Sequence, residues 1–326
     1  MANPLKFSVI IPYRVLDHYV RHCVEACREL RTPNFSFELI LLPDTITTES
    51  DLPQEGLTVH PTGPVFPSAK RNQGAHLAKA EYCAFIDSDA YPLPDWLLNA
   101  RDLLEKHPRV GCLGGPNHIP PGSPLLQCIG TRILYCRLGT GAFPERKLEK
   151  DYNEVMEMAS SNLIVRTALL RELGGMDTGL LTAEDALLCF QIREAGHIVA
   201  YAPNVEVFHH RRNFPWPYLR SIHRYGRDKA WILKERLTID KYYYFAPTFL
   251  VLGLFLGGLA AWLLPALRPL YAAVCLLYAA AILLQSIAFK NPPEILLGIV
   301  GIPATHVAYG IGFMTGLITT KGKNNA

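Results

Sequence analysis

The chain has 326 residues, a formal net charge of +3 and 49% hydrophobic residues, with a mean hydropathy of +0.12. This hydrophobic fraction is high for a purely soluble protein, and the small net charge gives no indication of a nucleic-acid partner. The eight cysteines are scattered and form no C-x-x-C pair, so we expect neither a disulfide framework nor a structural zinc site.

The N-terminal sequence MANPLKFSVIIPYR reaches charged residues and a proline at once. It lacks the long apolar core and the small-residue cleavage site of a secretory signal peptide. We therefore expect the first domain, residues 1–210, to remain in the cytosol.

Strand-like and helix-like segments alternate over the first third of the chain. Residues 6–11, 37–42 and 82–86 are short apolar runs, and helix-like segments separate and follow them. Nearly continuous apolar strands between helices predict an α/β domain with a mostly parallel sheet that is covered on both faces.

Polar residues follow these predicted strands. Ligands of such sheets bind beyond the carboxyl ends of the strands. Asp87 and Asp89 follow the third strand, and two carboxylates there can converge on Mg²⁺ or Mn²⁺, which prefer oxygen ligands and share them with phosphates. The alternative interpretation is that Asp87 and Asp89 are solvated residues that form a turn. One rim is expected to hold Pro12, Tyr13, Asp44, Asp87, Ser88 and Asp89.

Two further motifs carry charge at predicted helix starts. Lys70 and Arg71 begin the helix-like segment just upstream of the acidic pair, where cations can meet phosphate oxygens. Glu184 and Asp185 open a later helix, where the helix dipole favours acidic side chains. This dipole alone can account for an acid at Glu184, without any functional role. Asp185 would project toward a cleft, as a general base for an acceptor hydroxyl must.

Residues 211–241 combine aromatic and basic side chains just before the first long apolar run. Aromatic rings at headgroup level and cations facing anionic lipid are typical of a membrane-surface helix. A solvated charged helix is the alternative.

The C-terminal third is strongly apolar. Residues 242–267, 269–289 and 295–320 contain no Asp, Glu, Lys or Arg, and each run exceeds the roughly 20 helical residues that cross a bilayer core. We expect an α-helical membrane module over residues 242–320, followed by a tail, 321–326. Small residues in the third run favour close helix packing, so this run either lines the bundle or is re-entrant.

The ordered series FSVIIPYR, FELILLPD, SAKRNQGAHLAKAEYCAFIDSDAYP, SSNLIVRTALLRELGGMDTGLLTAEDALLCF and VEVFHH resembles the glycosyltransferase family 2 domain with a GT-A fold. The resemblance covers about residues 5–230. SIHRYGRDKAW and THVAYGIGFMTGL further resemble membrane-anchored members that build polysaccharides or lipid-linked glycans. The implied fold is a Rossmann-like, mixed, mostly parallel sheet with helices on both faces.

The resemblance implies an inverting transfer of a sugar from a nucleotide-diphosphate donor. Asp185 would be the catalytic base, with Glu184 on the acceptor side. Asp89 would coordinate Mg²⁺ or Mn²⁺ in a DXD motif, with Asp87 facing the ribose and the metal. His209 would contact the metal or the diphosphate, or else be a buried, hydrogen-bonded histidine. Nucleotide-sugar contacts are expected at Pro12, Tyr13, Asp44, Lys70, Arg71, Asp87, Ser88, Arg211 and Arg212.

The sequence departs from the family pattern at several positions. Pro43 stands where a first acid is common before Asp44, Arg14 replaces an asparagine, and Gln191 replaces an arginine. The Q-x-x-R-W signature of processive synthases is absent. These differences concern the donor pocket and polymerisation, and they leave the metal pair and the base in place.

The sequence thus predicts a multi-pass protein of the cytoplasmic membrane. It would transfer sugar from a nucleotide-sugar donor to a polyprenyl-linked or other lipid-borne acceptor, in contact with membrane lipids. A catalytically degenerate membrane scaffold and a lipid or glycan transporter are the alternatives. The absence of a P-loop motif and the small number of apolar runs argue against the transporter.

Overall fold

The computed structural model describes residues 3–46, 51–140, 152–236, 244–289 and 291–321. The chain divides into two compact units. Of the described residues, 3–46, 51–121 and 152–210 belong to the sheet unit, and 122–140, 211–236, 244–289 and 291–321 belong to the helical unit. The helical unit therefore includes residues 122–140, a segment inside the predicted 1–210 domain.

The sheet unit is built on a mixed sheet. In the described residues its order is β3-β2-β1-β4-β9-β6-β10-β8. The first four strands in this order are mutually parallel, and β6 and β10 are also parallel, whereas β9 runs antiparallel to both of its neighbours. The strands are β1 (Leu5–Pro12), β2 (Ser36–Leu42), β3 (Leu57–Val59), β4 (Tyr82–Ile86), β6 (Val110–Gly114), β8 (Asn153–Glu154), β9 (Asn162–Arg166) and β10 (Ile198–Tyr201).

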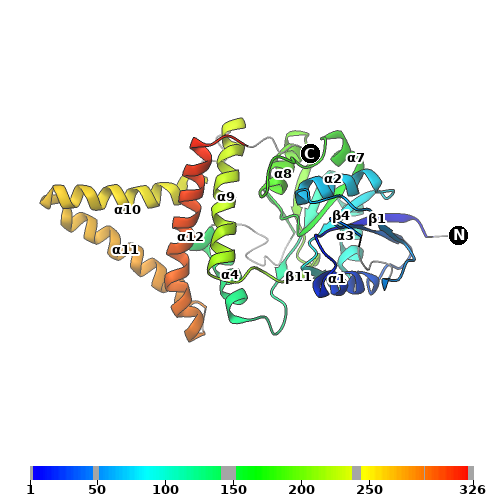
Figure 1. The fold of residues 1–326 in the computed structure, drawn as a ribbon, viewed down its shortest axis with the longest axis horizontal. Coiled ribbons are helices and arrows are strands. Elements are labelled where there is room, and N and C mark those ends of the chain that lie inside the picture. The colour runs from blue at the N-terminus through cyan, green and yellow to red at the C-terminus, as the bar shows by residue number, and fades with distance from the viewer. Residues whose placement is uncertain (1–2, 47–50, 141–151, 237–243, 290, 322–326) are drawn as a thin grey trace. The chain divides into compact units, whose positions relative to one another are not determined.

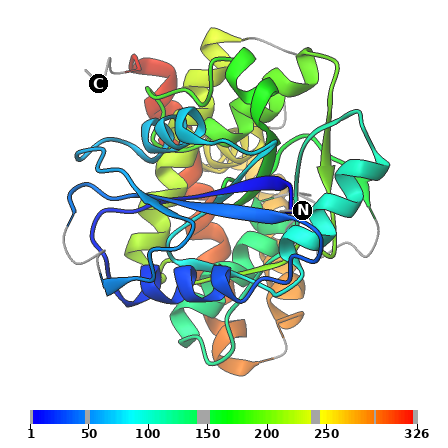
Figure 2. The same ribbon diagram turned by 90° about the vertical axis from the view of Figure 1, so that its right-hand side faces the viewer.

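Helices cover both faces of this sheet because successive strand side chains point to opposite faces. Val9 and Ile11 of β1 pack in one core with α1 and α3, whereas Ile10 packs in a second core with α2, α7 and α8. Helices α1 and α2 accordingly lie on opposite sides of the strands (Figures 1 and 2). The predicted α/β fold with a mixed sheet is confirmed. The helices are α1 (His18–Arg28), α2 (Pro67–Leu77), α3 (Trp96–Lys106), α7 (Thr167–Glu172) and α8 (Glu184–Glu194).

A small second sheet lies downstream of β4. Its strands are β5 (Ala90–Pro92), β7 (Asn117–His118) and β11 (Val207–His209), with β11 in the centre. The antiparallel register of β5 and β11 sets His209 opposite Ala90. Residues more than 100 positions apart in the chain are thereby brought to one place next to Asp89.

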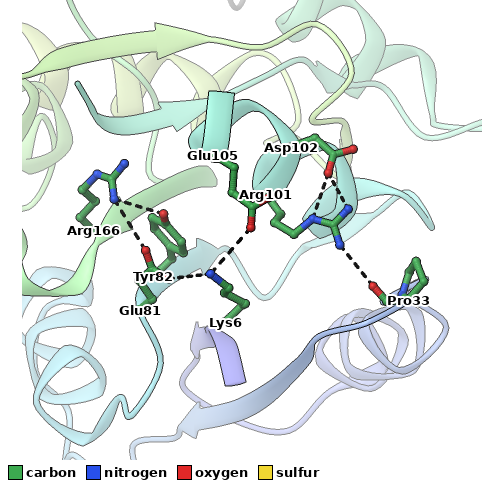
Figure 3. Close-up of polar contacts among 8 residues, drawn as sticks. All are labelled: Lys6, Pro33, Glu81, Tyr82, Arg101, Asp102, Glu105 and Arg166. Atoms are coloured by element: carbon green, nitrogen blue, oxygen red, sulfur yellow. Dashed lines mark hydrogen bonds and ion pairs between the residues drawn. The ribbon is translucent and has the colours of Figure 1, made fainter. Parts of the chain in front are cut away.

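A polar network lies at the amino-terminal ends of β1 and β4 (Figure 3). Lys6 Nζ donates to Glu81 Oε2 at 2.9 Å, and Arg166 Nη1 donates to the Tyr82 hydroxyl at 3.1 Å. Burial raises the pKa of Glu81, but hydrogen bonds from Lys6 and Tyr82 and the charge of Arg166 outweigh it, so the net pKa is lowered. The network ties the strand ends that lie at the opposite edge from the predicted rim.

A Glu81→Gln variant should be slightly less stable than the wild type at pH 7, by under about 1 kcal/mol, because water screens a pair whose side chains are 25% exposed at Lys6 and 46% exposed at Glu81. The lowered pKa means that the wild-type contribution is present above pH 4.5, the ordinary value, and is lost as the pH falls through the folded-state pKa. Melting temperatures in detergent at pH 7 and at pH 3.5 measure this, with exposed Glu55→Gln as control. A difference that grows in acid would contradict the assignment.

The helical unit contains three helices that are long and apolar enough to cross a membrane, among the residues that the structure describes: 246–263, 265–287 and 292–318. The predicted C-terminal membrane-type helices are confirmed in this sense, although residues 242–243 and 290 of the predicted module and residues 322–326 of the predicted tail lie outside the described residues. The elements of this unit are α4 (Leu125–Tyr135), α5 (Arg137–Thr140), α9 (Trp216–Glu235), α10 (Ala246–Leu263), η3 (Pro265–Leu267), α11 (Arg268–Ile287) and α12 (Pro292–Ile318).

Candidate active site

The carboxyl ends of three parallel strands form the rim of the candidate site. Strand β1 ends at Pro12, β2 ends two residues before Asp44, and β4 ends directly before Asp87. The Tyr13 amide donates to the Leu42 carbonyl at 3.1 Å, so the chain segments leaving β1 and β2 stay joined beyond the sheet. Because β9 is antiparallel to β4 and pairs Asn162 with Ile86, its amino-terminal end is at the same edge.

Two carboxylates and one imidazole converge just beyond this edge. Ligand atoms of Asp87, Asp89 and His209 all lie within 4.8 Å of one another. His209 Nε2 is 3.1 Å from Asp89 Oδ1, and the His210 amide donates to the Asp89 carbonyl at 2.9 Å. Carboxylate oxygens suit Mg²⁺ and Mn²⁺, and an imidazole nitrogen is a common additional donor for a transition metal. This donor set fits the divalent ion that the resemblance implies.

A buried guanidinium connects this cluster to the second acidic pair. Arg71 Nη2 is 2.6 Å from Asp87 Oδ1, and Arg71 Nη1 is 2.9 Å from Glu184 Oε1. Burial lowers the pKa of Arg71, but the charges of Asp87 and Glu184 outweigh it and raise the net pKa. Arg71 thus stays cationic, and by bonding both carboxylates it holds Asp87 and Glu184, which come from different elements, at a fixed separation.

The acidic pair at the start of α8 is held by unusual backbone geometry. Ala183, just before it, has a left-handed φ of 63°, a conformation that costs a non-glycine residue roughly 1–2 kcal/mol. Asp185 Oδ2 accepts from the Ser160 amide at 2.9 Å. Burial raises the pKa of Glu184 to about 8, and the Asp185 charge adds to the shift while Arg71 opposes it. Asp185 is less buried than Glu184, and each of its two carboxylate oxygens accepts a hydrogen bond from a backbone amide, Oδ2 from Ser160 and Oδ1 from Ala186.

Lys70 is directed at protein oxygens. Its ammonium group contacts Asp44 Oδ1 at 2.7 Å and donates to the Tyr13 and Leu42 carbonyls at 2.7 and 3.0 Å. Burial lowers the pKa of Lys70, and Asp44 opposes that shift. An ammonium has three donors, so these contacts use all of them and hold Asp44 at the rim. The Tyr13 ring is only 4% exposed and belongs to the hydrophobic core of the sheet unit.

The other predicted residues are placed as follows. Ser88 lies in the turn between Asp87 and Asp89 and is half-buried. Arg211 and Arg212 belong to the helical unit, where Arg212 Nη1 donates to Ser221 Oγ at 2.6 Å. The sheet unit itself brings together Asp44, Lys70, Arg71, Asp87, Asp89, Glu184, Asp185 and His209.

Sequence reasoning did not identify two features beside the cluster. The Ser160 amide orients Asp185, and a backbone donor has no side-chain signature. The second feature is a group of rings beside Asp89: His210 lies 4.8 Å from Tyr19 and 5.9 Å from Tyr91, measured between ring centroids, and Tyr91 lies 4.3 Å from His22. The doubled histidine in VEVFHH was the available signal for this group.

The mixed sheet with an acidic pair beyond its parallel strands defines a protein of the GT-A fold class. In agreement, the mannosyltransferase PcManGT from Pyrobaculum calidifontis, in complex with GDP-Man and Mn²⁺, superposes with a TM-score of 0.59 at 18% identity, covering 95% of this chain and 87% of that one. Residues 4–227 match the family described as glycosyltransferase like family 2, and the chain belongs to it. The resemblance seen in the sequence is thereby confirmed.

Two curated relatives share part of the chain. A glucosyl-dolichyl phosphate glucuronosyltransferase of Haloferax volcanii is 27% identical over 197 residues, which is 56% of this chain and 62% of the relative. An N-acetylglucosaminyl-diphospho-decaprenol L-rhamnosyltransferase of Mycobacterium tuberculosis is 29% identical over 143 residues, which is 40% of this chain and 43% of the relative. The matched part is therefore less than two thirds of the length of either relative.

Proposed function

We propose that this chain is an inverting, metal-dependent glycosyltransferase that moves a sugar from a nucleotide-diphosphate donor to a hydroxyl of a lipid-linked acceptor in glycan assembly. One observation carries the proposal: Arg71 joins the Asp87, Asp89 and His209 cluster to the Glu184 and Asp185 pair at one edge of the sheet. A site for a charged leaving group thus lies beside a site for a proton acceptor.

The donor end of the proposed site is the acidic cluster. A Mg²⁺ or Mn²⁺ ion held by Asp87, Asp89 and His209 would neutralise diphosphate charge and act as a Lewis acid. Asp44, fixed by Lys70, offers a carboxylate for hydrogen bonds to the nucleoside. Arg71 prevents Asp87 from turning away, because its planar guanidinium fixes the direction of the contact.

The acceptor end is Asp185. Its carboxylate takes the proton of the acceptor hydroxyl, and the oxygen forms a bond to the anomeric carbon of the donor sugar. The bond from that carbon to the diphosphate breaks, and the nucleoside diphosphate leaves with the electron pair. A single displacement of this kind inverts the anomeric configuration. The Ser160 amide keeps Asp185 oriented through one oxygen.

The helical unit and the names of the relatives support the proposed acceptor and the proposed membrane location. The names of the two curated relatives include dolichyl phosphate and a decaprenol diphosphate, both polyprenyl lipids. Three helices of this chain are long and apolar enough for a membrane. We therefore place residues 1–210 on the cytosolic side of the cytoplasmic membrane, with a polyprenyl-linked sugar as acceptor and residues 211–241 at the membrane surface.

A transfer assay tests the proposal. Membranes that contain the full chain should transfer sugar from one or more of a set of radiolabelled nucleotide sugars into a chloroform-extractable product, and the product anomer, determined by NMR, should be inverted. EDTA should abolish the transfer, and Mn²⁺ or Mg²⁺ should restore it. Transfer that is unaffected by EDTA would overturn metal dependence. A catalytically degenerate scaffold would give no transfer and no nucleotide-sugar binding by calorimetry.

A further inference from the structure

Helices α9 and α12 form a closely packed pair within the helical unit (Figure 1). A Cβ atom on Gly312 would overlap the His223 carbonyl oxygen, and one on Gly316 would overlap that of Arg227. The Trp231 indole donates to the Thr319 carbonyl at 3.2 Å, at the C-terminal end of α12. The two backbones therefore lie against each other over several turns, so α9 follows the orientation that α12 takes, either across the bilayer with it or along the membrane surface with it.

The face of α12 that points away from α9 is exposed and apolar. An α-helix has about 3.6 residues per turn, so Gly312 and Gly316 share the side that meets α9. The exposed residues repeat on the opposite side and continue from the first turn to the last. They are Leu296, Val300, Val307, Ile311 and Ile318, with exposed fractions of 67%, 61%, 45%, 46% and 86%.

The outer surface of α9 is basic. Arg220 and Arg224 are exposed one turn apart, near the middle of this 20-residue helix. If α12 crossed the bilayer, its partner α9 would carry these guanidinium groups to hydrocarbon depth, which is strongly unfavourable for a charged side chain. At the membrane surface the same groups would face water and anionic headgroups. Charge and packing therefore favour a surface position for the pair.

Helices α10 and α11 differ from this pair. They lead away from α12 as a hairpin joined by η3 (Figure 1). In the most apolar 18-residue stretch of each membrane-length helix, only 11% is buried for α10 and for α11, compared with 39% for α12. Phe255 and Leu277, near the middle of the two helices, are 70% and 72% exposed. At the tip, Trp262 is 72% exposed, and Arg268 donates to the Ala261 carbonyl at 3.2 Å. An aromatic ring beside a cation is typical of a membrane interface.

We propose that only the α10–α11 hairpin crosses the bilayer and that α12 lies along the membrane surface, its apolar stripe in the acyl boundary and α9 on its water side against anionic headgroups. The number of crossings is then even. The chain before α10 and the chain after α12 are consequently on the same side of the membrane, which also places Lys321, 3.6 Å from Glu235 at the end of α9, with the other cations.

Depth measurements on the full chain in anionic lipid vesicles test this proposal. Single spin labels are attached at Leu296→Cys, Val307→Cys and Ile318→Cys, with Cys128 and Cys275 replaced by alanine; the other six cysteines are buried. All three labels should report one shallow depth, roughly 5–10 Å below the headgroups. Labels at Phe255→Cys and Leu277→Cys are matched controls on the hairpin and should report the bilayer centre.

A helix α12 that crosses the bilayer would give a clearly different set of label depths. The three α12 positions span about 33 Å along the helix, so a crossing α12 would place Val307 at the bilayer centre and the two flanking labels in opposite leaflets. Epitope tags at the two ends of the chain, probed with protease in sealed vesicles, give an independent readout. Same-side tags with shallow labels support the proposal, whereas opposite-side tags or a deep Val307 label overturn it. Neither measurement depends on transferase activity.

Discussion

Replacement of Asp185 by asparagine should lower kcat for sugar transfer by about 10²–10⁴-fold, the usual contribution of a positioned general base. Asparagine retains the shape of the side chain, and its amide oxygen can still accept from the Ser160 amide, so the fold and donor binding should survive. The capacity to take the hydroxyl proton is lost, together with the hydrogen bond that Asp185 Oδ1 accepts from the Ala186 amide at 2.8 Å. Rates with saturating donor, together with calorimetric affinity for the nucleoside diphosphate, separate a loss of chemistry from a loss of binding.

Two matched variants sharpen the assignment of the base. Glu194→Gln removes an exposed carboxylate at the far end of the same helix, and it should leave kcat within about twofold of the wild type because it lies away from the site. Glu184→Gln removes the buried partner of Arg71, so its main effect should be on stability. Wild-type transfer by the Asp185 variant, combined with loss of transfer in the Glu184 variant, would move the base to Glu184.

The sheet was predictable where burial is complete. Strands β1, β2 and β4 appear in the sequence as nearly continuous apolar runs because both of their faces are covered. The direction of a strand leaves no such trace. The apolar run of β9 looks like the others, yet β9 is antiparallel to both neighbours, because direction depends on the connections on either side and not on the strand residues.

The sequence located several residues that the structure brings together at the candidate site, but not the contacts among them. Asp87 and Asp89 could be located because they end a strand. Lys70 and Arg71 were expected to face phosphate, but both bond protein carboxylates, at Asp44, Asp87 and Glu184. Arg71 and Glu184 are 113 positions apart, and no local pattern specifies a partner at that separation.

In the helical unit, too, the elements could be predicted from the sequence but their packing partners could not. Composition predicted three helices of membrane length, and the small residues of the third run predicted close packing. The structure identifies the packing partner of Gly312 and Gly316 as α9. The sequence could not identify this partner, because α9 is charged and α12 is apolar, and neither pattern alone contains information about the other.

Replacement of Asp89 by asparagine should weaken Mn²⁺ binding to the sheet unit's acidic cluster by at least about 10–100-fold. Loss of a residue that only hydrogen-bonds to a metal ligand already costs this much affinity, and Asp89 would be a ligand itself. Asparagine keeps an oxygen near His209 Nε2, now 3.1 Å from the carboxylate, but it removes the negative charge that a divalent cation requires. Binding of Mn²⁺, followed by its electron paramagnetic resonance signal in titrations of the full chain in detergent, measures the effect without any substrate.

The matched control for Asp89 is Asp102→Asn, which removes an exposed carboxylate that pairs with Arg101 away from the cluster (Figure 3). This variant should bind Mn²⁺ as the wild type does, because Asp102 is not one of the ligands that converge in the cluster. In transfer assays the Asp89 variant should need correspondingly more Mn²⁺ for half-maximal activity, since the deficit is one of metal binding. Unchanged Mn²⁺ affinity in the Asp89 variant would show that the ion, if bound, does not use this carboxylate, and the metal role would pass to Asp87 and His209.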